Sequence, residues 1–427
     1  MSAIKVFKFG GASVKDAEAV RNVLRILQRF NDERLVVVVS AMGKTTNAME
    51  RIVHAYFNNE DWSELLEERK SFHQNILQEL FKDDDPVHGV IHENFRLLEE
   101  LLSDEPSDNF DFEYDQIVSF GEILSTLIVS EYIHRQGIRS QWMDARKLIR
   151  TDNLYREGQV NWVKTQVKLQ EATLPFLEKP GVAIIQGFLG HTPERFTTTL
   201  GREGSDFTAA ICAWCLDARD VTIWKDVPGV LNADPKYFEN TVKLDSISFS
   251  EAIELSYYGA TIIHPKTIKP LQNKNIPLYA RSFVDPEERG TCISDDVSGD
   301  GKVPSFIFKV NQVLIRLTPK DFSFIAEDNM SDIFRRFADS QVPIRLMQNS
   351  AIHFSACVDW DDRRIPALLD SLSKNFAVEH DTGVELVTIR HYDAPTIERV
   401  TQLKEILVDQ RTPVTARMVL RDVTQSL

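Results

Sequence analysis

Hydrophobic and polar positions in the first two thirds of the chain alternate between strand-like and helix-like patterns. Short runs with a strand-like pattern predict strands at residues 4–9, 35–40, 181–188, 220–225 and 277–280, and residues 35–39 are fully apolar. Apolar residues at helical spacing predict helices at 17–30 and 46–57. Strands that alternate with helices are typical of a parallel sheet with helices packed on its faces. A helical, acidic stretch at about 62–102 predicts a lid or side bundle.

The pattern changes after the turn-rich segment Ser298-Gly-Asp-Gly-Lys-Val-Pro304. Strand-like runs follow at 306–317, 343–347, 351–358, 384–391 and 412–423. Helical patterns lie between them at 329–340, 364–375 and 395–407. The order βαββαβαβ fits two small ferredoxin-like α+β units, with the second intercalated in the first as one arrangement. We therefore predict a domain boundary in this segment, with domains at 1–297 and 305–427.

The chain has 427 residues and a net charge of −15, with 49 Lys and Arg against 64 Asp and Glu. This length suggests about two or three domains. The negative charge disfavours nucleic acids and anionic membranes as partners, so an anionic ligand must meet a local basic cluster. Apolar runs are shorter than the roughly 20 residues that cross a bilayer, and the opening residues lack the pattern of a secretion signal. We expect a cytoplasmic protein.

Cys212-Ala-Trp-Cys215 has the spacing of a redox motif or of half a zinc site. The pair lies in an alanine-rich stretch with a helical pattern, where residues three apart share a face. No second Cys-x-x-Cys or His pair completes a metal site. We expect these cysteines to be buried packing residues of a helix.

The first predicted strand runs directly into a glycine pair, in Lys8-Phe-Gly-Gly-Ala-Ser-Val14. Glycine lets an anion approach backbone N–H groups with no Cβ in the way, so phosphate is the expected ligand. A turn would also explain such glycines. The phosphate interpretation gains support from three polar or glycine-rich segments that each come directly after a strand-like run, because strand ends of a parallel sheet meet at one crevice. These segments are Ser40-Ala-Met-Gly-Lys-Thr-Thr-Asn47, Ser119-Phe-Gly-Glu122 and Thr199-Leu-Gly-Arg-Glu-Gly-Ser-Asp206.

Two common nucleotide-binding families are disfavoured. Gly43-Lys44-Thr45 resembles the end of a P-loop, but the first glycine of that loop would fall at Val38 and is missing. The His-Arg-Asp and Asp-Phe-Gly strings of protein kinases do not occur either.

The chain instead resembles the aspartate kinases of the amino-acid kinase superfamily, over essentially its whole length. The motifs that carry the resemblance, in the order and approximate spacing of that family, are Lys8-Phe-Gly-Gly-Ala-Ser-Val14, Ser40-Ala-Met-Gly43, Phe120-Gly-Glu122, Thr199-Leu-Gly-Arg-Glu-Gly-Ser-Asp206, Trp224-Lys-Asp-Val-Pro-Gly229, Ala233-Asp-Pro235 and Gly259-Ala-Thr-Ile-Ile-His-Pro265. The resemblance implies an α/β fold with an open, mainly parallel, carbamate kinase-like sheet, followed by ferredoxin-like ACT units. It also implies ATP-dependent phosphorylation of the side-chain carboxylate of L-aspartate, the first step of lysine, threonine and methionine synthesis.

The resemblance assigns roles to individual residues. It implies catalytic roles for Lys8 and Asp206, phosphate binding by Gly10, Gly11 and Ser13, and substrate binding by Thr45, Glu122, Arg202 and Ser205. Lys8 would approach the β- and γ-phosphates of ATP. Arg202 would bind the α-carboxylate of aspartate, and Glu122 with Asp206 would receive its ammonium group. A carboxylate acceptor is already ionised at neutral pH, which explains why no general base is needed. Taken singly, each residue also has a structural explanation, such as an acid at a helix N-terminus or a surface ion-pair partner.

The nucleotide contacts follow the family less closely. The resemblance implies ATP binding by Lys225, Asp226, Asp234 and Lys236. The chain departs from the family pattern at Ala12, Glu203, Lys225, Leu231, Lys236 and Thr261, the last of which stands where relatives commonly have a lysine. Lys225, Lys236 or Lys266 could compensate. Mg²⁺ should accompany ATP, held largely by phosphates and water, so no metal ligand is assigned.

The C-terminal units resemble ACT regulatory domains, which implies a homodimer and a possible effector, lysine or threonine. The usual glycine-containing loop is replaced by Phe322-Ser-Phe-Ile-Ala-Glu-Asp-Asn329. Two other functions stay open. A kinase of another small acid, such as N-acetylglutamate, would give Glu122 and Asp206 little purpose, because that substrate has no free ammonium. A catalytically silent amino-acid sensor is disfavoured because Lys8 and Arg202 are intact.

Overall fold

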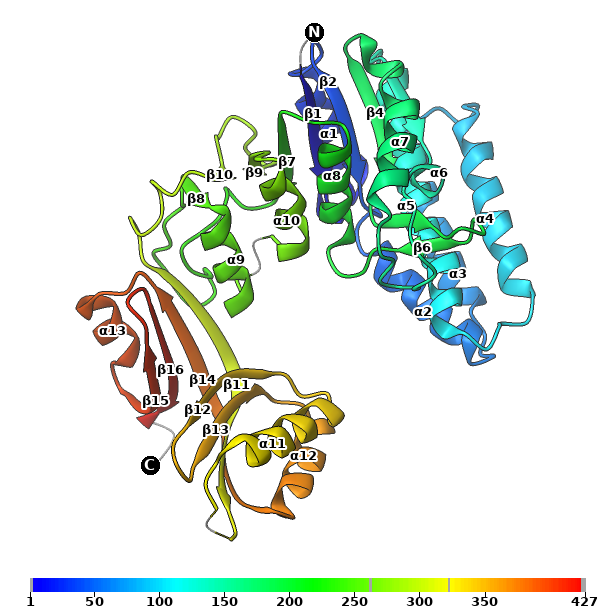
Figure 1. The fold of residues 1–427 in the computed structure, drawn as a ribbon. Coiled ribbons are helices and arrows are strands. Elements are labelled where there is room, and N and C mark those ends of the chain that lie inside the picture. Colours follow the sequence, from blue (N-terminus) through cyan, green and yellow to red (C-terminus); the bar gives the residue numbers. More distant parts are fainter. Residues whose placement is uncertain (1–2, 261–262, 322, 424–427) are drawn as a thin grey trace. The chain divides into compact units, whose positions relative to one another are not determined.

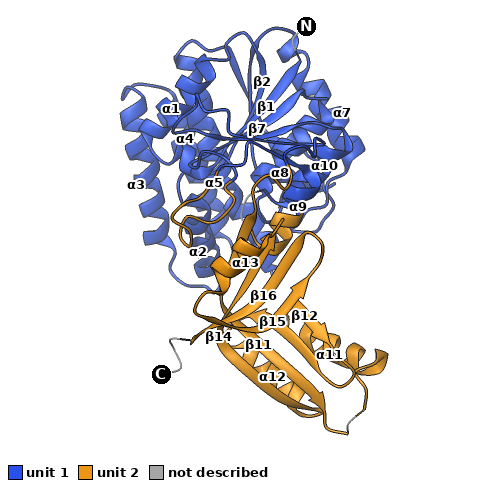
Figure 2. Cartoon of the chain, turned by 90° about the vertical axis from the view of Figure 1, so that its left-hand side faces the viewer, with its two compact units in different colours: residues 1–230, 243–253, 263–299 blue, residues 231–242, 254–262, 300–427 orange. Residues whose placement is uncertain are grey.

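The computed structural model of the chain describes residues 3–260, 263–321 and 323–423 (Figure 1). Thr261 and Phe322, which belong to segments quoted above, lie outside the described residues. Backbone contacts divide the chain into two compact units (Figure 2). Unit 1 consists of residues 1–230, 243–253 and 263–299, and unit 2 consists of residues 231–242, 254–262 and 300–427. The chain therefore passes between the units several times, and the functional domain limits 1–297 and 305–427 stay a prediction.

The centre of unit 1 is a mostly parallel sheet. Among the described residues it has eight strands in the order β3-β4-β2-β1-β7-β9-β10-β8. The bounds are β1 Ile4–Phe9, β2 Arg34–Val39, β3 Ser140–Met143, β4 Gly181–Gln186, β7 Asp220–Lys225, β8 Ser246–Ser248, β9 Leu278–Ser282 and β10 Thr291–Ser294. The pair β9–β10 is antiparallel and the other pairs are parallel. The predicted parallel sheet is confirmed, and β1 lies between β2 and β7 near its middle.

Helices cover both faces of this sheet (Figure 2). Their bounds are α1 Ala17–Gln28, α2 Thr45–Phe57, α3 Ser63–Leu80, α4 Val87–Ser103, α5 Phe110–Arg135, α6 Ala145–Leu148, α7 Trp162–Thr173, α8 Gly204–Cys215, α9 Phe249–Tyr258 and α10 Pro265–Asn273. Two short 3-10 turns, η1 Gly11–Val14 and η2 Phe176–Glu178, and a two-stranded ribbon, β5 Leu189–His191 with β6 Thr197–Thr199, complete the unit. Strand β2 is buried from Leu35 onward, as expected for a strand covered on both faces.

Buried side chains explain two features of the sequence. Cys212 and Cys215 are buried in α8, so the packing interpretation is confirmed, and burial raises the pKa of the Cys215 thiol to about 12. Helix α5 is long and apolar enough to cross a membrane, but 78% of its most apolar stretch is buried inside the protein. That burial is typical of a core helix.

Unit 2 contains an antiparallel sheet with the order β12-β13-β11-β14-β16-β15. The bounds are β11 Ser305–Pro319, α11 Glu327–Asp339, β12 Ile344–Asn349, β13 Phe354–Asp359, α12 Arg364–Ser373, β14 Phe376–Arg390, α13 Ala394–Thr401, β15 Lys404–Arg411 and β16 Thr415–Asp422. Strands β11 and β14 are long and pair along their whole length, with a register shift between Lys309 and Val313. Residues 312–382 form one complete βαββαβ unit, which is inserted between the two outer halves of β11 and β14. Those halves pair with each other and form a second four-stranded unit with β15 and β16.

One predicted C-terminal helix is wrong in part. The helix expected at 395–407 ends at Thr401, and Lys404–Arg411 forms the strand β15. Asp393 caps the start of the helix by accepting from Thr396 N, and the backbone leaves the helix at Gln402, whose ψ is 124°, before Leu403 adopts a left-handed φ of 60°. The following run pairs with β16, so the element order gains a strand that was not predicted.

The segment 231–242 belongs to unit 2 because of aromatic packing. The ring centroids of Phe238 and Phe306 lie 4.8 Å apart, and the guanidinium of Arg399 lies 4.7 Å from the centroid of Phe238. These contacts fix the segment against β11 and α13 within the same unit.

Candidate active site

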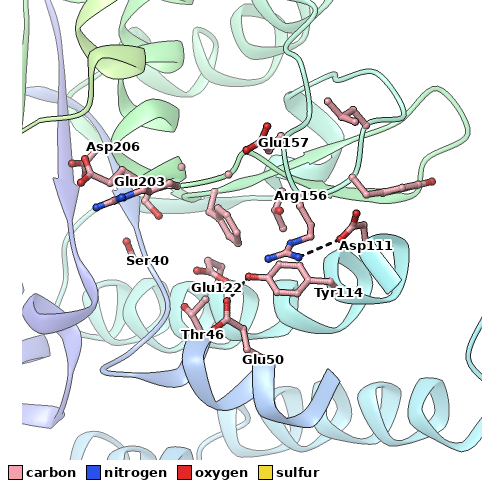
Figure 3. Close-up of a pocket in the computed structure, with 18 of the residues that line it drawn as sticks. Ser40, Thr46, Glu50, Asp111, Tyr114, Glu122, Arg156, Glu157, Glu203 and Asp206 are labelled. Carbon is pink, nitrogen blue, oxygen red and sulfur yellow. Dashed lines mark hydrogen bonds and ion pairs between the residues drawn. The ribbon is translucent and has the colours of Figure 1, made fainter. Parts of the chain in front are cut away.

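A pocket of about 900 Å³ lies in unit 1, where β1, β2, β4 and β7 end (Figure 3). The carboxyl ends of parallel strands are the usual place for a ligand in such a sheet. Six of the residues assigned by the resemblance line the pocket, namely Lys8, Glu122, Arg202, Ser205, Asp206 and Lys225. The sequence motifs that supply them are far apart along the chain, so the fold is what brings them together.

Lys8 and Asp206 form an ion pair at one end of the pocket. The Nζ of Lys8, on β1, lies 2.6 Å from Oδ1 of Asp206, in the first turn of α8. Their side chains are only 13% and 5% exposed, so solvent screens this pair less than a surface ion pair. The contact holds a positive charge at a defined place in the pocket.

The glycine pair lies next to this lysine. A Cβ on Gly10 would come within 3.3 Å of Lys8 Nζ. A Cβ on Gly11 would lie 2.7 Å from the carbonyl oxygen of Gly43 and 2.8 Å from that of Ala41, so only glycine fits there without a backbone shift. The buried Ser13 Oγ has no hydrogen-bond partner in the part of the chain that the structure describes. This unsatisfied hydroxyl lies in the turn η1 that follows β1 and fits a phosphate oxygen as its missing partner.

Glu122 is a buried acid on α5 with no ion-pair partner among the described residues. Its Oε1 accepts a hydrogen bond of 3.4 Å from the backbone N–H of Ala41. Burial raises the pKa of Glu122 to about 8, although the Ala41 N–H and the Thr46 hydroxyl partly oppose this shift. Because Glu122 lines the pocket, a cationic ligand group would find there a carboxyl whose ionised form it stabilises.

Arg202 presents an exposed guanidinium at the turn between β6 and α8. The turn uses left-handed backbone at Gly201, with φ of 74°, and at Glu203, with φ of 52°. The Glu203 carboxylate accepts from the backbone N–H of His264 at 3.1 Å, which fixes the turn. Arg202 makes no hydrogen bond or ion pair with any residue that the structure describes, so its donors are available to a carboxylate.

The residues at the other end of the pocket were not predicted from the sequence. The guanidinium of Arg156 lies over the ring of Tyr114, 4.4 Å from its centroid, and pairs with Asp111 at 3.2 Å (Figure 3). The Tyr114 hydroxyl donates to Glu50 Oε1 at 2.7 Å. All four side chains line the pocket. No sequence motif marks them, because they meet only through the packing of α2, α5 and the loop between α6 and α7.

Asp115 was also missed, and it orders this end of the pocket. Its Oδ2 accepts from the backbone N–H groups of Arg156 at 2.9 Å and of Thr199 at 2.8 Å, and its Oδ1 accepts from the Thr199 hydroxyl at 2.7 Å. Burial raises the pKa of Asp115 to about 6 against the effect of these bonds. A signal existed, because Asp115 precedes Glu122 by two helical turns and therefore lies on the same face of α5.

The remaining predicted residues do not line the pocket, and their roles stay predictions. Thr45 is buried, and its neighbour Thr46 is the one that lines the cavity. Asp226 is exposed. Asp234 and Lys236 lie in unit 2, where Asp234 Oδ1 accepts from the Lys236 N–H at 2.9 Å in a turn. Lys266, a possible compensating lysine, donates instead to the carbonyl oxygen of Leu200 at 2.9 Å.

Comparison with known proteins places this site in a family context. Residues 3–282 match the amino acid kinase family. The chain is 30% identical over 405 residues to the lysine-sensitive aspartokinase 3 of Escherichia coli, covering 91% of this chain and 87% of that protein. It is 30% identical over 395 residues to a chloroplastic bifunctional aspartokinase/homoserine dehydrogenase 2 of Arabidopsis thaliana, covering 88% of this chain but only 42% of that longer protein.

Solved structures agree with this match. The crystal structure of E. coli aspartokinase III in complex with lysine and aspartate, in its T-state, superposes with a TM-score of 0.83 at 26% identity. The match covers 99% of this chain and 97% of that one. The same protein in complex with aspartate and ADP, in its R-state, gives a TM-score of 0.79 with the same coverage.

Proposed function

The chain belongs to the amino acid kinase family, and we propose that it is an aspartokinase, which transfers the γ-phosphoryl group of ATP to the side-chain carboxylate of L-aspartate. One observation carries the proposal. The pocket holds the Lys8–Asp206 pair together with an unpaired guanidinium, Arg202, and a buried acid without an ion-pair partner, Glu122. These are the charges needed to bind an amino acid and a phosphoryl donor side by side.

The amino-acid end of the substrate is recognised by opposite charges. Arg202 receives the α-carboxylate, because a guanidinium can donate two parallel hydrogen bonds to it. Glu122 receives the ammonium, which lowers the raised pKa of this carboxyl and restores its charge. An N-acetylated acid has no ammonium to stabilise Glu122, so the alternative of an N-acetylglutamate-type kinase is disfavoured.

The chemical step needs charge neutralisation rather than a base. A new bond forms between an aspartate carboxylate oxygen and the γ-phosphorus, the bond from that phosphorus to the bridging oxygen breaks, and ADP leaves. Lys8 stabilises negative charge on the transferring group, and Asp206 holds Lys8 in place. Gly11 leaves room for the carbonyl oxygens of Ala41 and Gly43 and so allows the tight turn after β1, and the hydroxyl of Ser13, which has no partner among the described residues, would supply a donor.

Magnesium would accompany ATP and neutralise phosphate charge. No cluster of three or more His, Cys, Asp or Glu side chains that could hold a metal occurs in the described ranges. The phosphates and water would therefore supply most of its ligands, and no protein ligand is assigned.

Unit 2 is proposed to carry regulation and dimerisation, with lysine as the first candidate effector and threonine as the second. The E. coli relative is lysine-sensitive, and one of its structures contains lysine, which supports lysine here. Strands β12 and β15 are the edges of the sheet in unit 2. Their exposed apolar residues include Met347 and Ile406, which a second copy of the chain would cover.

The proposal is tested by trapping the product. The purified chain is incubated with aspartate, Mg-ATP and hydroxylamine, which converts an acyl phosphate to a hydroxamate. We expect aspartyl hydroxamate and stoichiometric ADP, and none from N-acetylglutamate. Lysine and threonine are then added at millimolar concentrations. ADP without hydroxamate, or hydroxamate only from another acid, would overturn the assignment.

A further inference from the structure

A second cavity, of about 290 Å³, lies in unit 1 over the amino-terminal halves of β1 and β7. In the sheet Lys5 is paired with Asp220, and Thr222 is paired with Tyr279, so all four side chains point to one face. Phe30, just after α1, and Arg289, just before β10, close the cavity. The active-site lysines Lys8 and Lys225 lie toward the opposite ends of the same two strands, so the two cavities are separate.

The lining of this cavity is strongly positive. Four cations line it, with Asp220 as the single lining carboxylate. The cations are Lys5, Arg219, Arg281 and Arg289. This concentration is unusual in a chain with a net charge of −15. A local basic cluster is what an otherwise acidic protein needs to hold an anion.

Two of these cations have their own carboxylates. Lys5 Nζ lies 2.7 Å from Glu33 Oε1, and Arg219 Nε lies 2.9 Å from Asp220 Oδ2. These pairs leave Arg281 and Arg289 as the unmatched charges of the cavity.

Arg281 is held in position without being neutralised. It donates to two backbone carbonyls, those of Pro286 at 2.7 Å and Glu288 at 3.2 Å, and it lies 4.9 Å from the ring centroid of Trp224. Burial, and after it the nearby charge of Arg29, lowers the pKa of Arg281. A bound anion would offset both the burial of the Arg281 charge and its repulsion by Arg29.

Arg289 is the second arginine of the cavity that lacks a carboxylate partner. It makes no hydrogen bond or ion pair within the ranges that the structure describes. The adjacent acids are already engaged, since Glu287 pairs with Arg29 and Glu288 lies 3.0 Å from Lys243. No neighbouring carboxylate in those ranges therefore competes for this guanidinium.

We propose that this cavity binds the phosphate group of a small molecule, either free phosphate or a phosphate monoester, through Arg281 and Arg289. Planar guanidinium groups match phosphate geometry with paired hydrogen bonds. The rings of Phe30 and Tyr279 border the rest of the cavity and would contact the uncharged part of an ester. The volume is near the lower limit of roughly 300 Å³ for small-molecule sites, which suits a metabolite and excludes a polymer. The proposal does not rest on the kinase assignment.

The test is calorimetric titration of the protein alone with inorganic phosphate and, separately, with AMP, repeated with saturating aspartate and ADP to occupy the proposed active site. We expect one saturable site in the wild type, and at least 10-fold weaker binding in Arg289→Gln. Arg289 has no partner among the described residues, so this variant should fold normally and keep its kinase activity in phosphate-free buffer. Arg281→Gln should weaken binding similarly. Arg25→Gln, which removes an exposed arginine of α1 paired with Glu18 at 2.6 Å, is the matched control.

Each outcome decides the proposal. Binding that is lost in Arg289→Gln and kept in Arg25→Gln supports it. Tighter binding of AMP than of phosphate, reduced in Tyr279→Ala, identifies a monoester, whereas equal binding identifies free phosphate. Binding that is equal in wild type and Arg289→Gln, absence of binding, or binding of citrate in place of phosphate would overturn it. Kinase activity is measured separately, so loss of this site and failure of the aspartokinase assignment give different results.

Discussion

Lys8 and Asp206 lie 2.6 Å apart, so the fifth residue of the first strand contacts the first turn of a helix that begins almost two hundred positions later. The contact fixes the lysine where the phosphoryl group is proposed to pass. The roles proposed for the pocket residues are tested by substituting the side chains that would contact the substrates, one at a time.

Lys8→Ala should lower kcat by about 10³-fold and leave aspartate affinity nearly unchanged, because the lysine interacts most strongly with the transition state. Steady-state kinetics and aspartate titration measure the two effects. Lys82→Ala, at an exposed lysine outside the pocket, is the control and should behave as wild type. An unchanged kcat with weaker aspartate binding would show that the role of Lys8 is misassigned.

Arg202→Ala should weaken aspartate binding by about 10- to 100-fold, which corresponds to the loss of a charge-assisted hydrogen-bond pair. Arg202 has no partner among the described residues, so the melting temperature should change little. The decisive result is a rise in KM without loss of stability. A large fall in melting temperature would mean instead that the arginine supports the fold.

Glu122→Gln should change how stability depends on pH. The carboxyl ionises at about pH 4.3 in the unfolded chain and at about pH 8 in the folded protein, so the folded state binds the extra proton between these values. Stability of the wild type is therefore lost as pH rises through this window, by up to about 1.4 kcal/mol per pH unit. Urea unfolding at pH 5, 6, 7 and 8 should show that the advantage of the Glu122→Gln variant over the wild type grows with pH. If the free energy of unfolding changed equally with pH in the two proteins, the raised pKa of Glu122 would be contradicted.

A second readout of the same substitution is the pH dependence of aspartate binding. The substrate ammonium needs the ionised form of Glu122, so wild-type affinity should increase as pH rises toward 8. Glu122→Gln should bind aspartate more weakly and lose this dependence. Calorimetric titration with aspartate at the same pH values measures this dependence. If the affinity changed equally with pH in the two proteins, a group other than Glu122 would bind the ammonium.

Asp115→Asn should cost about 1–3 kcal/mol of folding free energy, because an amide cannot accept all three hydrogen bonds that the carboxylate receives. It should also raise KM for aspartate, since the turn at Arg156 borders the pocket. Asp111→Asn removes an exposed partner of the same arginine and should cost under about 0.5 kcal/mol. Equal effects of the two substitutions would contradict the positioning role of Asp115.

Gly11→Ala should inactivate the protein, since the added Cβ would meet two carbonyl oxygens at 2.7 and 2.8 Å and displace the phosphate-binding turn. Gly89→Ala is a matched control in α4, where nothing lies within 4 Å of the new Cβ. That control should gain about 0.5–1 kcal/mol from better helix propensity. Activity assays and thermal unfolding compare the same chemical change at a crowded and at an open position, and full activity of Gly11→Ala would contradict the close approach.

The parts of the fold that follow local rules could be predicted from the sequence. The strand at 4–9 matches β1, because an apolar run ending in two glycines allows few other structures. Grouping Lys8, Glu122 and Arg202 in one site also succeeded. The expected reason, the convergence of parallel strand ends, holds for Lys8 on β1, but Glu122 lies within helix α5 and Arg202 follows strand β6 of the two-stranded ribbon.

The failures arose where distant packing decides the structure. Leu403 has a left-handed φ just before β15, which pairs with β16. No residue before Leu403 marks this change in the sequence. Arg156 and Tyr114 carry no motif, because their contact depends on how α5 lies against a loop. Phe238 joins unit 2 through aromatic contacts with residues almost 70 positions later, and no local pattern around it predicts such packing.

The continuous strands of unit 2 also constrain the order of events during synthesis. Strand β11 pairs with β14 from Ser305 opposite Arg390 to Pro319 opposite Phe376. At ~5–20 residues per second, roughly 3–11 s pass on the ribosome between the completion of β11 and the start of β14. Through that interval β11 lacks the partner that both ferredoxin-like units require. The nascent chain therefore holds β11 without its longest partner, and the backbone edge that β14 later pairs with stays open until β14 is made.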